Sequence, residues 1–279
     1  MFSYILTSII PIPLGYNTKV IIPINMVKDN IVKNSKNYKI EVSLIAYKEG
    51  SKFFEKNRVI NENSKGFIEI EIEDQSKISD KFGYAELNIK SLSKTNIFLS
   101  RAVLGFYTFY YYNGKKSFLS DNAYKFGSPT IIAQMAKIKK YIDAYPTIMI
   151  NKTNDLDETI VLINPYKRKI KAKIITFDGR EINNIIINSF SVKEILLSQI
   201  LQDNENEWKG HIQLTAANRI ITFNYKHSFK DKKIISDFEH LDPYRGDPTF
   251  IPFTKLLRQK IGTYLSQIKY DFKLIFNLR

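Results

Sequence analysis

No cysteine occurs in this chain, and that absence removes several kinds of chemistry at once. A chain without thiols forms no disulfide bond, no cysteine-ligated zinc or iron–sulfur site and no thiol nucleophile. The sequence also lacks a Gly-rich phosphate-binding loop, a His-Glu-x-x-His motif and a Gly-x-Ser-x-Gly motif. No familiar catalytic signature therefore points to an enzyme.

Long apolar runs are missing as well. No stretch approaches the roughly 18 apolar residues that a membrane-spanning helix needs, so we expect no transmembrane span. The N-terminal segment MFSYILTSIIPIPLGYN is apolar but lacks the basic start of a signal peptide and contains Pro11 and Pro13. We expect it to form a buried edge strand, and a cytoplasmic location is favoured.

Acidic residues are outnumbered, with 28 Asp and Glu against 42 Lys and Arg, which gives a net charge of +14. This excess favours an anionic partner such as an anionic glycan, an acidic protein or another polyanion. A bias toward Lys, Ile and Asn also arises from AT-rich coding, so the net charge alone does not establish an anionic partner. The sequence has no recognition-helix, zinc-finger or RRM pattern, so sequence-specific nucleic-acid binding is not expected.

Short segments with alternating, β-branched side chains fill most of the chain. They lie near 17–25, 38–48, 66–73, 83–91, 97–112 and 115–121, and again near 159–164, 168–178, 210–217, 219–229 and 232–238. Such spacing predicts an all-β protein with Ig-like or jelly-roll-like β-sandwich domains.

An aromatic stretch, LGFYTFYYYNGKKSFLSD, shows the alternation most clearly. It places Tyr107 and Tyr111 on one side of a strand, and Asn113-Gly114 favours a type I′ hairpin turn. The predicted register sets Phe109 opposite Phe118. The stretch is either the central hairpin of a sheet or a ligand-stacking face that uses Tyr107 and Tyr111.

Weak matches between the two halves keep their order along the chain. The matched pairs are Asn25 with Asn164, Gly50 with Gly179, Gly83 with Gly210, Ser120-Asp121 with Ser236-Asp237, and Gly127-x-Pro129-Thr130 with Gly246-x-Pro248-Thr249. We predict an internal duplication into domain 1 (1–135) and domain 2 (136–253), with a short helical connector and a basic amphipathic C-terminal tail (254–279).

The copies are expected to differ at one element. Residues 66–73 alternate as a strand, whereas SVKEILLSQIL has Ser191 and Glu194 in capping-box spacing and predicts a short helix.

All three histidines occupy positions that the first copy fills with tyrosine. His211 and His227 are therefore candidate ligand-binding residues. A polar loop adds candidate ligands for a divalent metal, because carboxylates with an imidazole hold such ions or share acid–base work: Asp237, Glu239, His240 and Asp242. The alternative is that this loop contains only turn-forming residues.

A row of lysines follows one side of the predicted strand at 168–178. Lys169 and Lys171 are candidate contacts to an anionic partner, and the alternative is a solvated face that discourages edge-to-edge aggregation. Together these features predict a non-catalytic tandem binding or assembly protein for an anionic partner. Two other functions stay open: a metal-binding or hydrolase-like protein that uses the domain 2 loop, and a self-associating structural subunit that forms a homo-oligomer.

Overall fold

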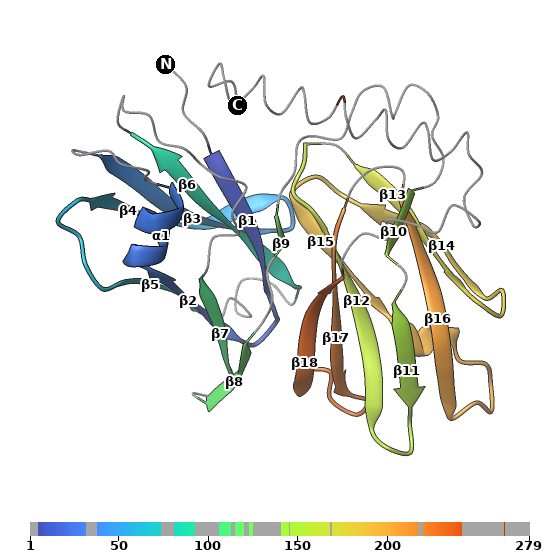
Figure 1. Cartoon of the computed structure of the whole chain (residues 1–279). Helices are drawn as coiled ribbons and strands as arrows, with labels where there is room; N and C mark the ends of the chain where they lie inside the picture. Colours follow the sequence, from blue (N-terminus) through green and yellow to red (C-terminus); the bar gives the residue numbers. More distant parts are fainter. Residues whose placement is uncertain are drawn as a thin grey trace. The chain divides into compact units, whose positions relative to one another are not determined.

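A computed structural model describes the chain in two compact units (Figure 1). The described residues are 5–31, 38–73, 81–92, 106–112, 115–119, 123–124, 141–144, 146–167, 169–216, 220–241 and 265. Residues up to 124 belong to the first unit, and those from 141 onward to the second. The predicted domain boundary at 135/136 lies outside the described residues, and so does the predicted tail apart from Leu265.

The described chain is nearly all β, as the sequence predicts. The first unit contains two antiparallel sheets with the strand orders β4-β3-β6-β1-β9 and β5-β2-β7-β8. Their strands are β1 (Ile5–Ile12), β2 (Asn17–Pro23), β3 (Lys39–Lys48), β4 (Ser51–Asn61), β5 (Phe67–Ile72), β6 (Gly83–Ser91), β7 (Tyr107–Tyr112), β8 (Lys115–Leu119) and β9 (Ala123–Tyr124). Figure 1 shows the two sheets of this unit as two layers.

Both sheets of the first unit contribute alternate side chains to one hydrophobic core. Val20 and Ile22 enter it from β2, and Val42 and Leu44 enter it from β3. The two-residue period of a strand sends their neighbours to the opposite face. The hydroxyl of Tyr110 on β7 donates a buried hydrogen bond to the carbonyl oxygen of Pro11 on β1 at 2.7 Å, which joins the two layers.

The second unit has the strands β10 (Tyr141–Ala144), β11 (Thr147–Asn151), β12 (Leu156–Asn164), β13 (Ile170–Thr176), β14 (Glu181–Ile187), β15 (Ser191–Leu196), β16 (Glu207–Ala216), β17 (Ile221–Ser228) and β18 (Ile235–Leu241). Their order is β14-β13-β16-β11-β12-β17-β18, with β10 beside β16 and β15 beside β12. The core of the second unit contains side chains from several of these strands, for example Ile160 from β12 and Ile174 from β13.

Several local predictions were wrong or incomplete. The N-terminal strand β1 is not an edge strand, because it lies between β6 and β9. The edge strands β4 and β14 were not predicted. The predicted strand 17–25 ends two residues early, because Ile24 and Asn25 belong to helix α1 (Ile24–Ile31), which was not predicted. Its Ile24 and Val27, three residues apart, both enter the core, which is a helical spacing.

The predicted helix near residue 191 is a strand. Residues Ser191–Leu196 form β15 and pair with β12 over six rungs, from Asn164–Ser191 to Thr159–Leu196. Ile195 is buried while its neighbour Leu196 is exposed, as expected when successive side chains of a strand face opposite ways. Only Leu197–Ile200 turn as a short 3-10 helix, and no side-chain hydrogen bond caps it. Pairing with β12 therefore overrides the local capping-box pattern.

The aromatic hairpin forms, but its register shifts within it. Tyr112 pairs with Lys115 and Tyr111 with Lys116, as predicted for a two-residue turn. Beyond that point Tyr110 pairs with Phe118, because Ser117 is an extra residue in β8. This β-bulge moves the partner of Phe109 from Phe118 to Leu119.

Among the described residues, no helix has the length and apolar character that a membrane span requires.

The contact between Tyr110 and Pro11 gives a stability prediction. Tyr110→Phe leaves the buried carbonyl of Pro11 without this donor, so we expect a loss of about 1–2 kcal/mol of unfolding free energy. Tyr111→Phe is the matched control, because that side chain is half-buried and has no hydrogen bond to its hydroxyl among the described contacts. Urea unfolding of both variants measures the difference. Equal stability of the two variants would contradict the role of the bond.

Candidate functional site

The two candidate tyrosines lie on the outer face of the sheet β5-β2-β7-β8. Thr108 and Tyr110 point into the core, so Tyr107 and Tyr111 point away from it. Tyr107 is 47% exposed, whereas Tyr111 is half-buried. The aromatic face is therefore open at Tyr107 and partly covered toward the hairpin turn.

His227 occupies an interior position. It lies on β17 opposite Asp157 of β12 and is only 2% exposed. Its Nε2 lies 2.9 Å from Oγ1 of Thr159, and its Nδ1 lies 2.8 Å from the carbonyl oxygen of Ser228. Because both ring nitrogens have partners in the interior, this position lends no support to His227 as a ligand contact.

The predicted metal ligands do not converge in the part that the structure describes. Asp237 and Glu239 lie on one face of β18, and His240 lies on the other. Asp237 forms an ion pair with Lys226 at 3.1 Å, whereas the ring of His240 lies 5.3 Å from that of Phe223. The described residues contain no cluster of three His, Asp or Glu side chains that could hold a metal. Asp242 lies outside them, so a metal site that includes it stays a prediction.

The remaining candidates do share a surface. Ile170, Ala172 and Ile174 of β13 are buried, so the lysines between them face outward. Ile212 and Leu214 of β16 are buried in the same way. β13 and β16 are adjacent, and Lys173 lies opposite Thr215. The outward side chains form what we call the basic face: Lys169, Lys171, Lys173, Lys209 and His211.

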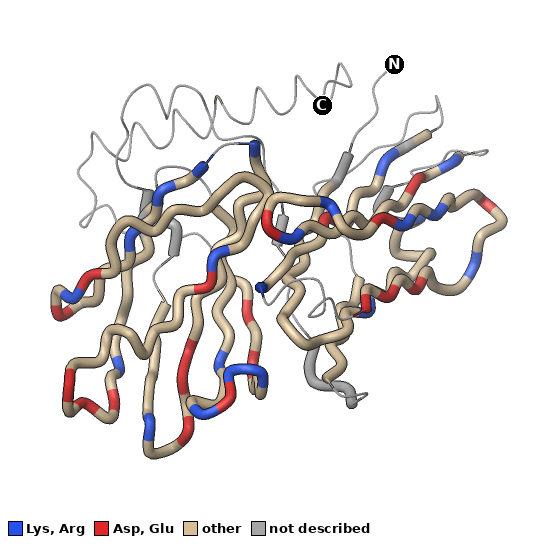
Figure 2. Tube along the Cα trace, turned by 180° about the vertical axis from the view of Figure 1, so that it is seen from behind, with Lys and Arg blue, Asp and Glu red and all other residues tan. Residues whose placement is uncertain are grey.

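Most of the charge on the basic face is not neutralised locally. Lys173 forms an ion pair with Glu181 of β14. Lys169, Lys171 and Lys209 form no ion pair with any described residue. Nδ1 of His211 forms a hydrogen bond with Oγ1 of Thr147 at 2.9 Å. Figure 2 shows how Lys and Arg alternate with other residues along the strands. Three cations of the basic face thus have no ion-pair partner among the residues that the structure describes.

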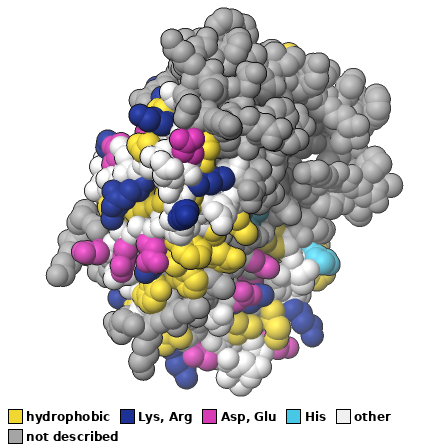
Figure 3. Space-filling model, turned by 60° about the vertical axis from the view of Figure 1, so that its left-hand side comes forward, with side chains coloured by type: hydrophobic (Ala, Val, Ile, Leu, Met, Phe, Trp, Pro, Cys, Tyr) yellow, Lys and Arg dark blue, Asp and Glu magenta, His cyan; other side chains and the backbone are white. Residues whose placement is uncertain are grey.

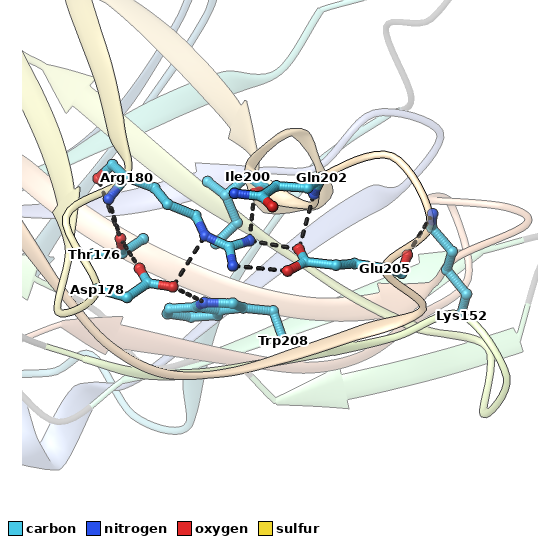
Figure 4. A network of polar contacts seen from close by, with 8 residues as sticks. All are labelled: Lys152, Thr176, Asp178, Arg180, Ile200, Gln202, Glu205 and Trp208. Atoms are coloured by element: carbon cyan, nitrogen blue, oxygen red, sulfur yellow. Dashed lines mark hydrogen bonds and ion pairs between the residues drawn. The ribbon is translucent and has the colours of Figure 1, made fainter.

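Arg180 behaves differently, although it lies in the same unit. Its guanidinium contacts both carboxylate oxygens of Glu205 at 2.5 and 2.8 Å and Oδ2 of Asp178 at 3.0 Å (Figure 4). It also donates to the carbonyl oxygen of Ile200 at 2.9 Å. Asp178 in turn accepts a bond from the indole of Trp208 at 3.1 Å. The hydrogen bond from Arg180 lowers the pKa of Glu205.

This arginine cluster was not identified from the sequence, because its members are far apart along the chain. Its charges are satisfied internally: one guanidinium faces two carboxylates, and Gln202 donates its backbone N–H to Glu205. The bidentate pairing of Arg180 with Glu205 fixes the relative orientation of the two side chains. The cluster therefore fastens the β13–β14 hairpin to the loop at 200–206 and leaves no cation for a ligand.

Two adjacent carboxylates of β12, Asp157 and Glu158, are buried. Glu158 accepts hydrogen bonds from the backbone N–H of Met149 at 2.8 Å and from the side-chain amide of Asn224 at 2.6 Å. Burial raises the pKa of Glu158 above its ordinary value near 4.5, and these bonds oppose the shift. Burial also raises the pKa of Asp157. Both groups are enclosed, which favours a structural role.

The raised pKa of Glu158 predicts a pH-dependent effect of Glu158→Gln. The carboxyl group of Glu158 holds its proton more tightly in the folded state than in the unfolded chain. The stability that the protonated group contributes is complete below pH 4.5, and it is lost as the pH rises through the pKa of the folded state. Gln stays neutral throughout. The stability of the variant relative to the wild type should therefore improve between about pH 4 and pH 7.5.

Urea unfolding at both pH values measures this difference, and Glu71→Gln on the exposed side of β5 controls for the loss of one negative charge. A Glu158→Gln difference that is constant with pH would refute the explanation.

Comparison with known proteins adds no family to this description. No protein-family model matches the chain, and no curated protein matches its sequence. The function is therefore inferred from the arrangement of the chain's own residues, and the basic face carries three of the sequence candidates on one side of the sheet.

Proposed function

We propose that this chain is a non-catalytic binding and assembly protein whose basic face holds an anionic partner. The observation that carries the proposal is that Lys169 and Lys171 of β13 lie on the same outer face as Lys209 and His211 of the adjacent strand β16. The register places His211 beside Phe177, so the two pairs lie about 20 Å or more apart along that face. Paired strands hold these residues at fixed positions. Unneutralised lysines on a fixed platform attract anions and impose a spacing on them.

The spacing of the charges favours an extended partner over a small one. Lys169 and Lys171 are two residues apart on a strand, which separates their Cα atoms by about 6.6 Å. The adjacent strand β16 lies about 4.8 Å away, and its Gln213, opposite Ile175, adds a polar group to the same face. An anion with charges repeated along a line can meet several of these groups at once.

Exposed apolar side chains border the basic face and increase the contact it can offer. Phe177, 65% exposed, follows β13, and Ile186, 48% exposed, lies opposite Lys171 on β14. Met149 of β11 lies opposite Lys209 and is also exposed. Binding surfaces often combine an apolar centre with charged surroundings.

We further infer that the two units are β-sandwich domains derived from a duplication. Their strands have corresponding neighbours: β5-β2-β7-β8 in the first unit corresponds to β15-β12-β17-β18 in the second. The order β4-β3-β6-β1 likewise corresponds to β14-β13-β16-β11. The strand β15 removes the one difference between the copies that the sequence predicts, because it takes the place of β5.

A shared irregularity supports the same inference. The hairpin β7–β8 has its bulge between the rungs of Tyr110 and Tyr111, where Ser117 is the extra residue. The hairpin β17–β18 has its bulge between Lys226 and His227, where Ser236 is extra. Strand pairing makes His227 the counterpart of Tyr111, so the two bulges fall at the same rung. Bulges tend to be retained within related structures.

Strand pairing also revises the alignment between the copies. The match of Gly83 with Gly210 is in phase, because Ala85 and Ile212 both enter the cores. The match of Asn25 with Asn164 is one residue out of phase, since Val20 must correspond to the core residue Ile160. Ser117, not Ser120, corresponds to Ser236 at the bulge.

Heparin is a suitable polyanionic probe for the basic face, and Trp208 is the only tryptophan in the chain and neighbours Lys209. Lys169→Gln, Lys171→Gln and Lys209→Gln together should weaken heparin binding about tenfold or more at about 50 mM salt, because three cations are lost. Fluorescence titration of Trp208 or calorimetry measures the affinity.

The control replaces three cations of β4 in the first unit: Lys52→Gln, Lys56→Gln and Arg58→Gln. Wild-type binding should also fall steeply as salt is raised to about 300 mM. Salt-independent binding, or an equal loss in the control, would contradict the proposal.

A further inference from the structure

The first unit carries a surface of opposite charge. The outward residues of β5 alternate with its buried isoleucines, so Glu69, Glu71 and Glu73 all lie on the outer side of the chain there. On that side Ile21 of β2 lies opposite both Glu69 and Tyr107. We call this surface the acidic face; its members are Phe67, Glu69, Glu71, Glu73 and Tyr107. It also contains one cation, Lys19 of β2, which lies opposite Glu71, so three carboxylates face one ammonium group.

Apolar side chains also border the acidic face. Phe67 is 64% exposed and Tyr107 is 47% exposed. Figure 3 shows hydrophobic side chains gathered between acidic and basic ones on the side of the molecule that includes the first unit. The acidic face thus resembles the basic face in composition, with charges in a row and exposed apolar groups beside them, but the sign of its charge is reversed.

The charges on the two faces have the same repeat. Glu69 and Glu71 on β5, like Lys169 and Lys171 on β13, are two residues apart, so each pair of Cα atoms is separated by about 6.6 Å. Glu71, Lys169 and Lys171 form no ion pair among the described residues. Glu69 does form one, with Lys19 at 2.6 Å, as Lys173 does with Glu181. The two lysines of the basic face can therefore lie along the two glutamates of the acidic face with each Lys opposite a Glu.

We infer that the anionic partner of the basic face is the acidic face of a second copy of this chain. The inference rests on the proposed function of the basic face and names its partner. Each copy then uses unlike surfaces toward its two neighbours, one from each unit. Contacts between unlike surfaces extend into a filament or close into a ring, in contrast to a symmetric dimer. Opposite charges guide the approach, and the apolar groups become buried on contact.

The test is a charge exchange, followed by light scattering and sedimentation velocity over a range of protein concentrations at about 50 mM salt. Wild-type chains should associate as concentration rises. Glu69→Lys with Glu71→Lys makes both faces basic, and Lys169→Glu with Lys171→Glu makes both acidic. Each double variant should associate about tenfold or more weakly than the wild type, because like charges then meet.

Two rescues separate the inference from a general effect of charge. An equimolar mixture of the two double variants should associate again, because each offers a complementary face to the other. A single chain that carries all four substitutions should also self-associate, since its two faces have exchanged signs. Circular dichroism and melting curves verify that all variants are folded, which is expected because the four substituted side chains are exposed.

Heparin binding distinguishes the failure of this inference from that of the proposed function. A wild type that stays monomeric, or association that Glu69→Lys with Glu71→Lys leaves unchanged, overturns the inference. If heparin still binds through Lys169 and Lys171 in that case, the proposed function stands and the partner is a different polyanion. If neither association nor salt-sensitive heparin binding is found, both are overturned.

Discussion

Burial of every second side chain along each strand is the constraint that determines where the charges of this protein lie. Ile170, Ala172 and Ile174 are held in the core of the second unit, so Lys171 and Lys173 have to face outward. Burying one isoleucine side chain contributes about 1.5–3 kcal/mol. A slip of one residue would expose these side chains and bury the lysines. The core therefore fixes the sign and spacing of the surface.

The same constraint explains why a count of charges says little about binding. Arg180 is a strong cation, but Asp178 and Glu205 engage it fully. Lys226 is likewise paired with Asp237. By contrast, Lys171 and Lys209 of the basic face lie opposite apolar residues, Ile186 and Met149. A charge becomes available to a partner when the fold separates it from its opposite.

Much of the strand pattern could be predicted from the sequence, because alternation along a segment such as 67–72 is a local property. Features that depend on distant partners could not. β15 has a helical capping pattern and becomes a strand through pairing with β12. The bulge at Ser117 depends on how β8 meets β7. The basic face was predicted only in part, since Lys209 belongs to it only because β16 lies beside β13 in the sheet.

The two units do not repeat each other's open surfaces. The acidic face lies on β5 and β2, and the corresponding sheet of the second unit buries Phe223 and Tyr225 on its matching side. The basic face lies on β13 and β16, and the first unit buries Ser43 and Glu86 at matching strands. Under the proposed duplication, each copy has kept one outer face open, and a different one. An arrangement with one open face of each sign suits contacts between successive chains, because neither surface is complementary to itself.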